Sequence, residues 1–452
     1  MANENKMGYL PIKKLILQMS LPPMCSMFLQ YSYNLVDSMF VANINENALA
    51  AVSLSFPITT LMISLSIWIG VGINVLIAGY LGEKEQDLAD CATTLGLLVA
   101  LIVGICINIL ALLIMKPYFS AFTNNPAIFD YAMQYMSVCA FMQVPNMVHI
   151  AIQKVFQGTG NMITPMWFQI AGVIFNFVFD PLLIFGIGPF PKMGIEGAAL
   201  ATGIGQTLTL AIYLVVYFVR PIRVHIRRQY ILLSKKMVIK LYSIGIPATL
   251  NLALPSLLIS ALNAILAAYS EVYILVLGIY YKLQTFIYLP ANGIVQGMRP
   301  LIGYNYGAGE NKRVSQIYKI VLCMSGIIMV LGTVICLLIP GQLMGLFTHT
   351  EATIQTGKTA LRIIGAGFIV SAVSVTSSGA LEGLGKGIPS LLISLCRYVV
   401  VIIPTAFLLS SIFGAVGVWN AFWITEAITA IISICVYYKA ISQSQRSQST
   451  VK

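Results

Sequence analysis

The sequence predicts an all-α integral membrane protein with twelve transmembrane helices in two six-helix bundles. Three observations predict this class. Of the 452 residues, 58% are hydrophobic and only 9% are charged. Apolar stretches of about 20 residues, the length that crosses a bilayer as a helix, recur along the chain. The second half also repeats short patterns of the first half in the same order. Together these features exclude a soluble protein.

The twelve spans follow one another with short connections, and each is long enough to cross the hydrocarbon layer as a helix. We expect them at residues 14–42, 48–78, 92–115, 128–156, 163–186, 195–219, 238–268, 272–302, 314–337, 353–381, 388–412 and 415–438. An even number of spans places both termini on the same side of the membrane.

The basic residues indicate that this side is the cytoplasm, because Lys and Arg are enriched in cytoplasmic loops. Of the 26 Lys and Arg residues, 20 fall on the side of the termini. Only four fall on the other side: Lys116, Lys192, Lys358 and Arg362. We therefore expect a multi-pass protein of the plasma or inner membrane with cytoplasmic termini. The net charge of +11 then reflects topology and attraction to lipid, and no nucleic-acid partner is expected.

The cysteines and histidines predict no metal centre. The eight cysteines lie mostly within the expected spans and form no CxxC pair, so they indicate small packing residues and not a disulfide framework. His149 lies within the fourth span, where a packing histidine with satisfied ring nitrogens is favoured over a proton relay. We expect no cofactor apart from a transported ion.

A single internal repeat predicts two homologous lobes. A shift of 225 residues lays Ser20-Leu21-Pro22 on Gly245-Ile246-Pro247, and 157–161 on 382–386, whereas a shift of 220 pairs 194–201 with 414–421. Each repeat holds an even number of spans, so the lobes share one orientation and are related by an axis along the membrane normal. We expect an N-terminal lobe at 1–219, a basic cytoplasmic linker at 220–237, a C-terminal lobe at 238–442 and a cytoplasmic tail at 443–452.

Polar residues within the first-half spans predict an ion site. Asp37 is a lone carboxylate in the first span, where an acid costs roughly 2.5 kcal/mol or more. Asn176 and Asp180 are four residues apart and share one helix face, and Asp37, Asp180 and Thr202 are expected at a similar depth. These are oxygen donors, suited to Na⁺ or to holding a proton. The alternative is that each polar side chain only holds helices together.

The second half does not repeat this arrangement. Its acid within a span is Glu426, for which a substrate or proton role and a structural pair remain open. Lys282 is expected near the middle of the membrane, where it would line a cavity or neutralise an acid. Arg397 lies only about two to three turns from the inner end of its span, so its side chain is expected to reach the cytoplasmic interface. This asymmetry assigns ion coupling to the first half.

These residues resemble the multidrug and toxic compound extrusion (MATE) family, and more narrowly its MepA-like members, over nearly the whole chain. The resemblance rests on Tyr33-Asn34-Leu35-Val36-Asp37, Ala48-Leu49-Ala50-Ala51-Val52, Gln157-Gly158-Thr159-Gly160-Asn161, Gly197-Ala198-Ala199-Leu200-Ala201-Thr202 and Asn305-Tyr306-Gly307-Ala308-Gly309. It implies the MATE fold and an antiporter that exports bulky, often cationic and aromatic compounds against inward Na⁺ or H⁺.

The resemblance also implies a cation site in the amino-terminal lobe, at the positions of Asp37, Asn176, Asp180 and Thr202. Some relatives instead depend on acids in helices seven and ten. The expected spans here hold amides and hydroxyls in those two helices and no acid, so we expect no coupling site there. The polar residues at those positions are Asn251, Asn263, Ser371, Ser374 and Thr376.

The drug cavity is expected to use aromatic and methionine side chains, which adapt to varied shapes. Candidate residues are Tyr33, Met62, Gln143, Phe175, Asn176 and Tyr280, with Lys282 and Glu426. Cation binding at Asp37 and Asp180 would let the first bundle repack by bending helix one near Pro22 and Pro23.

Two other functional classes are less compatible with the sequence. A lipid-linked-sugar flippase of the same superfamily remains the alternative, although it would need several basic residues within the spans to hold a pyrophosphate. An enzyme is not expected, because the sequence carries no HExxH, GxSxG or GxxxxGK[ST] motif. We expect a monomer whose partners are small organic molecules and the lipid bilayer.

Overall fold

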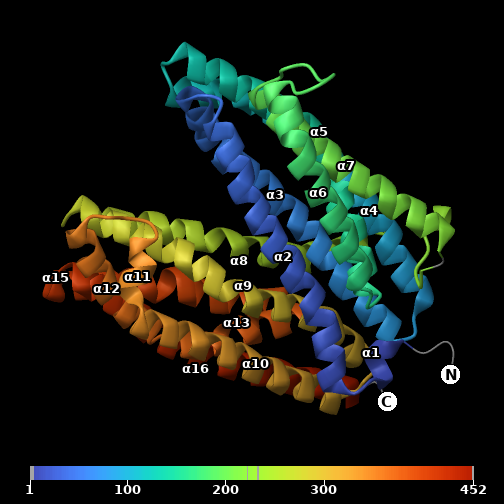
Figure 1. The fold of residues 1–452 in the computed structure, drawn as a ribbon. Helices are drawn as coiled ribbons and strands as arrows, with labels where there is room; N and C mark the ends of the chain where they lie inside the picture. The colour runs from blue at the N-terminus through green and yellow to red at the C-terminus, as the bar shows by residue number, and fades with distance from the viewer. Residues whose placement is uncertain (1–4, 221, 232–233, 450–452) are drawn as a thin grey trace. The chain divides into compact units, whose positions relative to one another are not determined.

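The computed structural model describes residues 5–220, 222–231 and 234–449, and these ranges contain helices and no strands. Figure 1 shows long helices joined by short turns. The α-helices are α1 (Lys6–Tyr9), α2 (Ile12–Ala42), α3 (Glu46–Gly82), α4 (Gln86–Phe122), α5 (Pro126–Gly158), α6 (Ile163–Phe185), α7 (Ile195–Val219), α8 (Lys235–Ala267), α9 (Glu271–Gly307), α10 (Asn311–Leu338), α11 (Pro340–Gly345), α12 (Glu351–Gly365), α13 (Phe368–Gly383), α14 (Gly387–Leu395), α15 (Ile402–Phe413) and α16 (Ala415–Ser449). A 3₁₀ turn, η1 (Arg228–Tyr230), and a π-helix, η2 (Cys396–Val400), complete them.

Each of the twelve predicted ranges lies on one helix or on one series of consecutive helices. By length and apolarity, ten helices of the described chain could cross a membrane, or eleven if the bent pair α12 and α13 counts as one span. That pair bends by 54° at its break. The remaining predicted range coincides with α2, which is 31 residues long and less apolar because it carries prolines, glutamines and Asp37. The all-α, multi-pass membrane class is confirmed.

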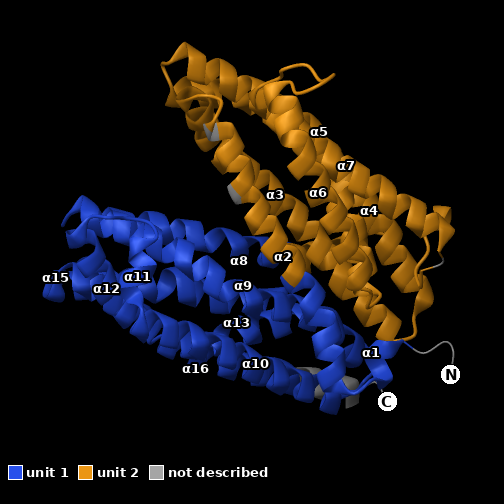
Figure 2. Ribbon diagram, in the orientation of Figure 1, with its two compact units in different colours: residues 1–24, 246–452 blue, residues 25–245 orange. Residues whose placement is uncertain are grey.

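The chain forms two compact units (Figure 2). Unit 2 is Cys25–Gly245, and unit 1 combines Met1–Met24 with Ile246–Lys452. The division falls within α2 between Met24 and Cys25, one residue after Pro23, and within α8 between Gly245 and Ile246, just before Pro247. It therefore differs from the predicted lobe limits in assigning the first 24 residues to the unit of the second half. Within that unit, Ser20 donates a hydrogen bond to the Ile294 carbonyl of α9 at 3.4 Å.

Matching turns at the predicted offset support the internal repeat. Left-handed backbone occurs at Gly160 (φ 87°) and Gly385 (φ 73°), and again at Lys84 (φ 62°) and Gly309 (φ 75°); both pairs lie 225 positions apart. The same offset relates a close helix contact. A Cβ at Gly158 would meet the Asn74 carbonyl at 3.0 Å, and a Cβ at Gly383 would meet the Arg299 carbonyl at 2.8 Å.

The capping residues repeat as well, which explains why the long helices begin where they do. Asn45 caps α3 by accepting a hydrogen bond from the Ala48 N–H, and Ser270, again 225 positions later, caps α9 by accepting from the Val272 N–H. Such caps satisfy amide groups that have no partner within their own helix. The two halves therefore fold by the same local rules.

The core of unit 1 is a large apolar cluster contributed mainly by α8, α9, α12, α13, α15 and α16. It includes Leu258, Leu262, Tyr280, Phe368 and Phe422, all under 7% exposed. In unit 2, Ile152 and Phe156 of α5 pack with Tyr213 of α7. These apolar cores hold the polar groups described next.

Candidate cation site

Four predicted site residues come together in unit 2, on α2, α6 and α7. Tyr33 and Asp37 are four residues apart and share one face of α2. The Tyr33 hydroxyl lies 2.8 Å from the Thr202 hydroxyl of α7, with which it shares a hydrogen bond. Tyr33 also interacts electrostatically with Asp37 and with Asp180 of α6. The structure therefore brings Asp37, Asp180 and Thr202 around Tyr33.

Four carboxylate and amide oxygens of this group are buried without a well-formed hydrogen bond in the described residues, although the Tyr33 hydroxyl interacts with the Asp180 carboxylate. Asp180 is 1% exposed and Asn176 is 6% exposed. Within the described chain, both oxygens of Asp180, Oδ1 of Asn176 and Oδ1 of Asp37 are buried and accept no hydrogen bond of acceptable geometry. Buried acceptors without donors are costly, because they have lost water and gained nothing. A bound cation or a proton would supply what these oxygens lack.

Two further side chains surround Asp37, and sequence reasoning missed both. Tyr135 and Cys139 of α5 interact electrostatically with Asp37 and hydrogen-bond to each other. They are one turn apart on a helix that the sequence marks only as apolar, so no local signal identified them. Asp37 is therefore flanked by side chains of α5 and α6.

Gly205 of α7 makes room for Asn176. A Cβ at position 205 would overlap Asn176 Oδ1 and would reach Asn176 Nδ2 at 3.3 Å. The amide is therefore held against the bare backbone of α7. Its position depends on the absence of a side chain at Gly205.

The arrangement can hold a small hard cation or a proton. Carboxylate and amide oxygens are the ligands that such cations prefer. Two buried carboxylates also repel each other, so binding one positive charge between them lowers the energy of the site. The described residues contain no cluster of three or more His, Cys, Asp or Glu side chains that could hold a metal ion.

The corresponding region of unit 1 is apolar. The repeat places Leu258 and Leu262 opposite Tyr33 and Asp37, and Phe422 opposite Thr202. These three residues are 3%, 0% and 6% exposed and belong to the unit 1 core. The polar group is therefore specific to the first half of the chain.

Three residues predicted to line the drug cavity pack against their neighbours in unit 2. Gln143 Nε2 of α5 donates to the Met62 carbonyl of α3 at 3.2 Å and to Ser66 Oγ at 3.0 Å. Both Gln143 and Met62 are under 5% exposed. Phe175 stacks on Phe179 with ring centroids 4.0 Å apart. These contacts give Gln143 a role in helix packing, and the cavity itself stays a prediction.

The predicted residues of unit 1 have partners of their own. Arg397 Nε and Nη2 donate to Glu426 Oε1 at 2.8 and 2.6 Å, so Glu426 forms the structural pair that the sequence left open. Arg397 is 7% exposed, and its extension to the interface is wrong. Tyr280 is 1% exposed in the apolar core. Lys282 is exposed, with its ammonium group 5.7 Å from the centre of the Phe347 ring.

His149 lies with its ring 5.7 Å from that of Tyr213 in unit 2, as a packing histidine would. Within the described chain, neither of its ring nitrogens has a hydrogen-bond partner. The predicted packing role agrees with this placement, but the prediction of a hydrogen-bonded packing histidine is wrong, because both ring nitrogens are buried without a partner in the described residues.

A second polar cluster joins four helices of unit 1. Glu382 at the end of α13 is 2% exposed and accepts from Asn251 Nδ2 of α8 at 2.8 Å and from Ser390 Oγ of α14 at 3.2 Å. Arg299 Nη2 of α9 lies 2.6 Å from Glu382 Oε2 in an ion pair. Glu382 falls just beyond the predicted tenth span, so its burial went unrecognised, although the repeat aligned it with Gln157.

Comparisons with known proteins agree with this architecture. The model of the MatE family matches residues 22–182 and 247–408. The multidrug export protein MepA of Staphylococcus aureus (strain MRSA252) is 25% identical over 435 residues, which cover 95% of this chain and 94% of the relative. MepA of Staphylococcus saprophyticus is 24% identical over 426 residues, covering 94% and 93%.

Solved structures show the same fold. A crystal structure of MATE in complex with MaD5 superposes with a TM-score of 0.91 at 23% identity, covering 98% of this chain and 99% of that one. An outward-facing multidrug resistance MATE family transporter of the MOP superfamily gives 0.90 at 23% identity, covering 98% of both chains. The family model spans most of the chain in two matching segments. The chain therefore belongs to the MatE family and has the fold of the MATE transporters.

Proposed function

We propose that this protein is a multidrug efflux transporter that exports cationic and aromatic compounds by alternating access, as an antiporter coupled to inward Na⁺ or H⁺. Its relatives of similar length are named multidrug export proteins. The coupling ion binds in unit 2, at Asp37, Asn176 and Asp180, with Thr202 holding Tyr33 beside them.

One observation carries the proposal. Four oxygens of Asp37, Asn176 and Asp180 are buried without donors in the described chain, and two of the three groups are carboxylates. Such a site is stabilised when a cation or a proton enters and destabilised when it leaves. A transporter needs this property, because ion binding must change the relative energies of two conformations.

Ion and drug are coupled because each favours a different one of the two conformations of the transporter. One bound cation between Asp37 and Asp180 offsets the repulsion between the two carboxylates and lets α2 and α6 approach, whereas in the empty site this repulsion pushes the two helices apart. The prolines of α2 supply the place where the helix can bend, because Pro22 and Pro23 remove backbone hydrogen bonds. Drug and ion favour opposite states, so inward movement of the ion drives outward movement of the drug.

Na⁺ and H⁺ remain alternatives for this site. Sodium would use the oxygens of Asp37, Asn176 and Asp180 as ligands. A proton would reside on one carboxylate and could be donated to a neighbouring oxygen. The donor set fits either ion.

The flippase alternative has less support. A pyrophosphate needs converging basic side chains. Arg397 is neutralised by Glu426 at 2.6 Å, and Lys282 lies over the ring of Phe347.

The test is ethidium efflux from energised membrane vesicles, with a Na⁺ gradient and a pH gradient imposed separately. We expect efflux under one of the two gradients, and its loss in Asp37→Asn and Asp180→Asn. The matched control is Asp130→Asn, which removes an exposed carboxylate of α5 and should transport at the parent rate.

Efflux under neither gradient would refute the antiporter. Parent-rate efflux by both Asp37→Asn and Asp180→Asn would remove this site from coupling.

A further inference from the structure

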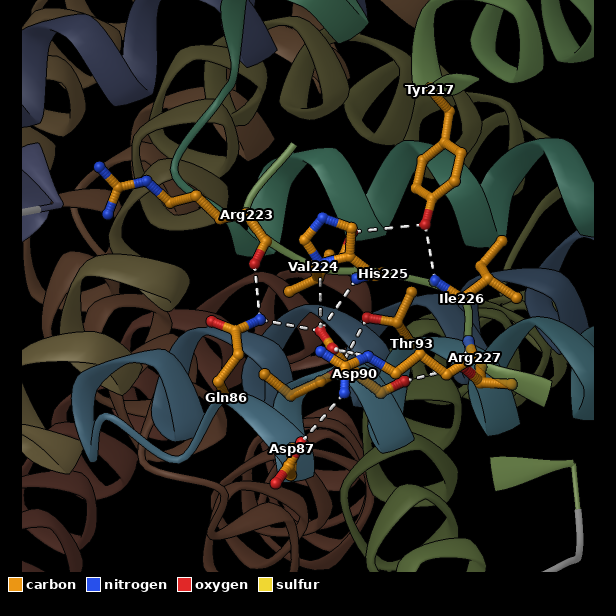
Figure 3. A network of polar contacts seen from close by, with 12 residues as sticks. Gln86, Asp87, Asp90, Thr93, Tyr217, Arg223, Val224, His225, Ile226 and Arg227 are labelled. Atoms are coloured by element: carbon orange, nitrogen blue, oxygen red, sulfur yellow. Dashed lines mark hydrogen bonds and ion pairs between the residues drawn. The ribbon is translucent and has the colours of Figure 1, made fainter. Parts of the chain in front are cut away.

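The segment that joins α7 to α8 is fixed to unit 2 by a buried carboxylate. Asp90 of α4 is 0% exposed and lies at the centre of the network in Figure 3. Its Oδ1 accepts from the His225 N–H at 2.9 Å and from Gln86 Nε2 at 2.8 Å. Its Oδ2 lies 2.9 Å from Arg227 Nε in an ion pair. A buried charge that is paired and hydrogen-bonded in this way specifies one geometry.

Further hydrogen bonds hold residues 223–227 of the same segment. The Ile226 N–H donates to Tyr217 Oη at 2.7 Å, and the Arg227 N–H donates to Thr94 Oγ1 at 3.1 Å. Gln86 Nε2 also donates to the Arg223 carbonyl at 2.7 Å. Val224 is 0% exposed between Arg223 and His225, which are both exposed. Residues 222–231, here called the strap, are therefore docked on unit 2 and present a defined outer face.

That outer face is strongly basic and partly apolar. No Asp or Glu occurs between Glu196 and Glu271, whereas residues 220–240 hold four Arg and three Lys. Arg227 is neutralised by Asp90, which leaves the other basic residues to set the charge. Those exposed are Arg220, Arg223, Arg228, Lys235, Lys236 and Lys240. Phe218 and Val219, which directly precede them, are 77% and 74% exposed.

The position of the strap brings this face to the membrane surface. The strap joins α7, which ends at Val219, to α8, which begins at Lys235, and both helices are long and apolar enough to cross a membrane. Exposed apolar side chains next to guanidinium and ammonium groups match the interface between acyl chains and phosphates. The guanidinium group of Arg in particular can donate two parallel hydrogen bonds to two oxygens of one phosphate.

We propose that the docked strap is a binding surface for anionic phospholipid headgroups. Arg223 and Arg228 contact the phosphates, and Asp90 holds the strap so that these side chains face the lipid. Each basic residue near such a surface strengthens binding about fivefold.

The test is native mass spectrometry of the full-length protein with phosphatidylglycerol or phosphatidylcholine added to the detergent. We expect preferential retention of phosphatidylglycerol, weakened about fivefold by Arg223→Gln and again by Arg228→Gln. Lys312→Gln is the matched control, because it removes an exposed charge of unit 1 outside the strap and should change little.

The Asp90→Asn variant distinguishes lipid binding by the docked strap from lipid binding by net positive charge alone. It makes the protein more basic, so binding by net charge alone predicts stronger retention of phosphatidylglycerol. A docked surface predicts weaker retention, together with faster trypsin cleavage within residues 222–231. Equal retention of the two lipids by the parent, or unchanged retention by the Arg223→Gln/Arg228→Gln variant, would overturn the proposal. If Asp90→Asn does not fold, the arginine variants still decide.

Discussion

Gly205→Ala should damage the cation site without unfolding the protein. The new methyl group would overlap Asn176 Oδ1, and it would approach Asn176 Cγ to 3.0 Å and Nδ2 to 3.3 Å. The whole amide must therefore turn away from α7. The strain is small because the obstructing atoms lie at the end of a side chain that can rotate.

The affinity for the coupling ion should fall because the Asn176 amide is a candidate ligand. Asn176 Oδ1 is one of four buried oxygens without donors, so displacing it removes one candidate ligand and leaves the carboxylates in place. Disturbing the arrangement around a bound metal ion typically weakens binding by about 10- to 100-fold. We expect about tenfold weaker coupling-ion affinity. The change in unfolding free energy should stay at about 1 kcal/mol, because the helix preference for Ala over Gly offsets part of the cost of the added methyl group.

The assay is ethidium efflux as a function of Na⁺ or H⁺ concentration, which gives the half-saturating ion concentration. Gly104→Ala is the matched control, because its Cβ would make only ordinary contacts, the nearest at 3.4 Å. Gly205→Ala should raise the half-saturating concentration about tenfold, whereas Gly104→Ala should leave it unchanged. Equal values for the parent and Gly205→Ala would show that Asn176 is not a ligand.

Other predictions concern stability, measured as unfolding free energy in detergent. Arg397→Gln should lower the unfolding free energy by about 3 to 5 kcal/mol, because it leaves Glu426 buried without its partner. Adding Glu426→Gln should recover part of that loss, whereas additive losses from the two substitutions would contradict the pairing. Glu382→Gln should cost less, about 2 kcal/mol, because its partner is one-quarter exposed; a change within error would refute its role in joining helices. Lys84→Gly should stabilise by about 1 kcal/mol by relieving a φ of 62°, and Gly309→Ala should destabilise by a similar amount; the opposite signs would refute this reasoning.

Much of the fold could be predicted because membrane helices are specified locally. An apolar run of sufficient length forms a helix, since backbone groups in lipid must be satisfied within the segment. The repeat added the two-lobed organisation, and the left-handed turns at Gly160 and Gly385 show why the offset is nearly constant. The division of α2 after Pro23 was missed, because it depends on packing with the second half.

The central residues of the candidate cation site stand out in the sequence because acids are costly in membrane helices, which makes Asp37 and Asp180 conspicuous. Their neighbours could not, since Tyr135, Cys139 and Gly205 look like ordinary helix residues. Buried acids at helix ends were missed for a different reason. Asp90 and Glu382 lie where charge is common, and only the folded structure shows that both are enclosed.

Ion binding to the purified protein tests the central claim most directly, namely that the coupling cation binds between Asp37 and Asp180. Na⁺ binding would be measured by calorimetry, and proton release on ethidium addition by a pH indicator. We predict that the parent shows one of these two signals, that Asp180→Asn abolishes it, and that the Arg397→Gln/Glu426→Gln variant retains it. An undiminished signal in folded Asp180→Asn, or its loss only in the Arg397→Gln/Glu426→Gln variant, would contradict the account.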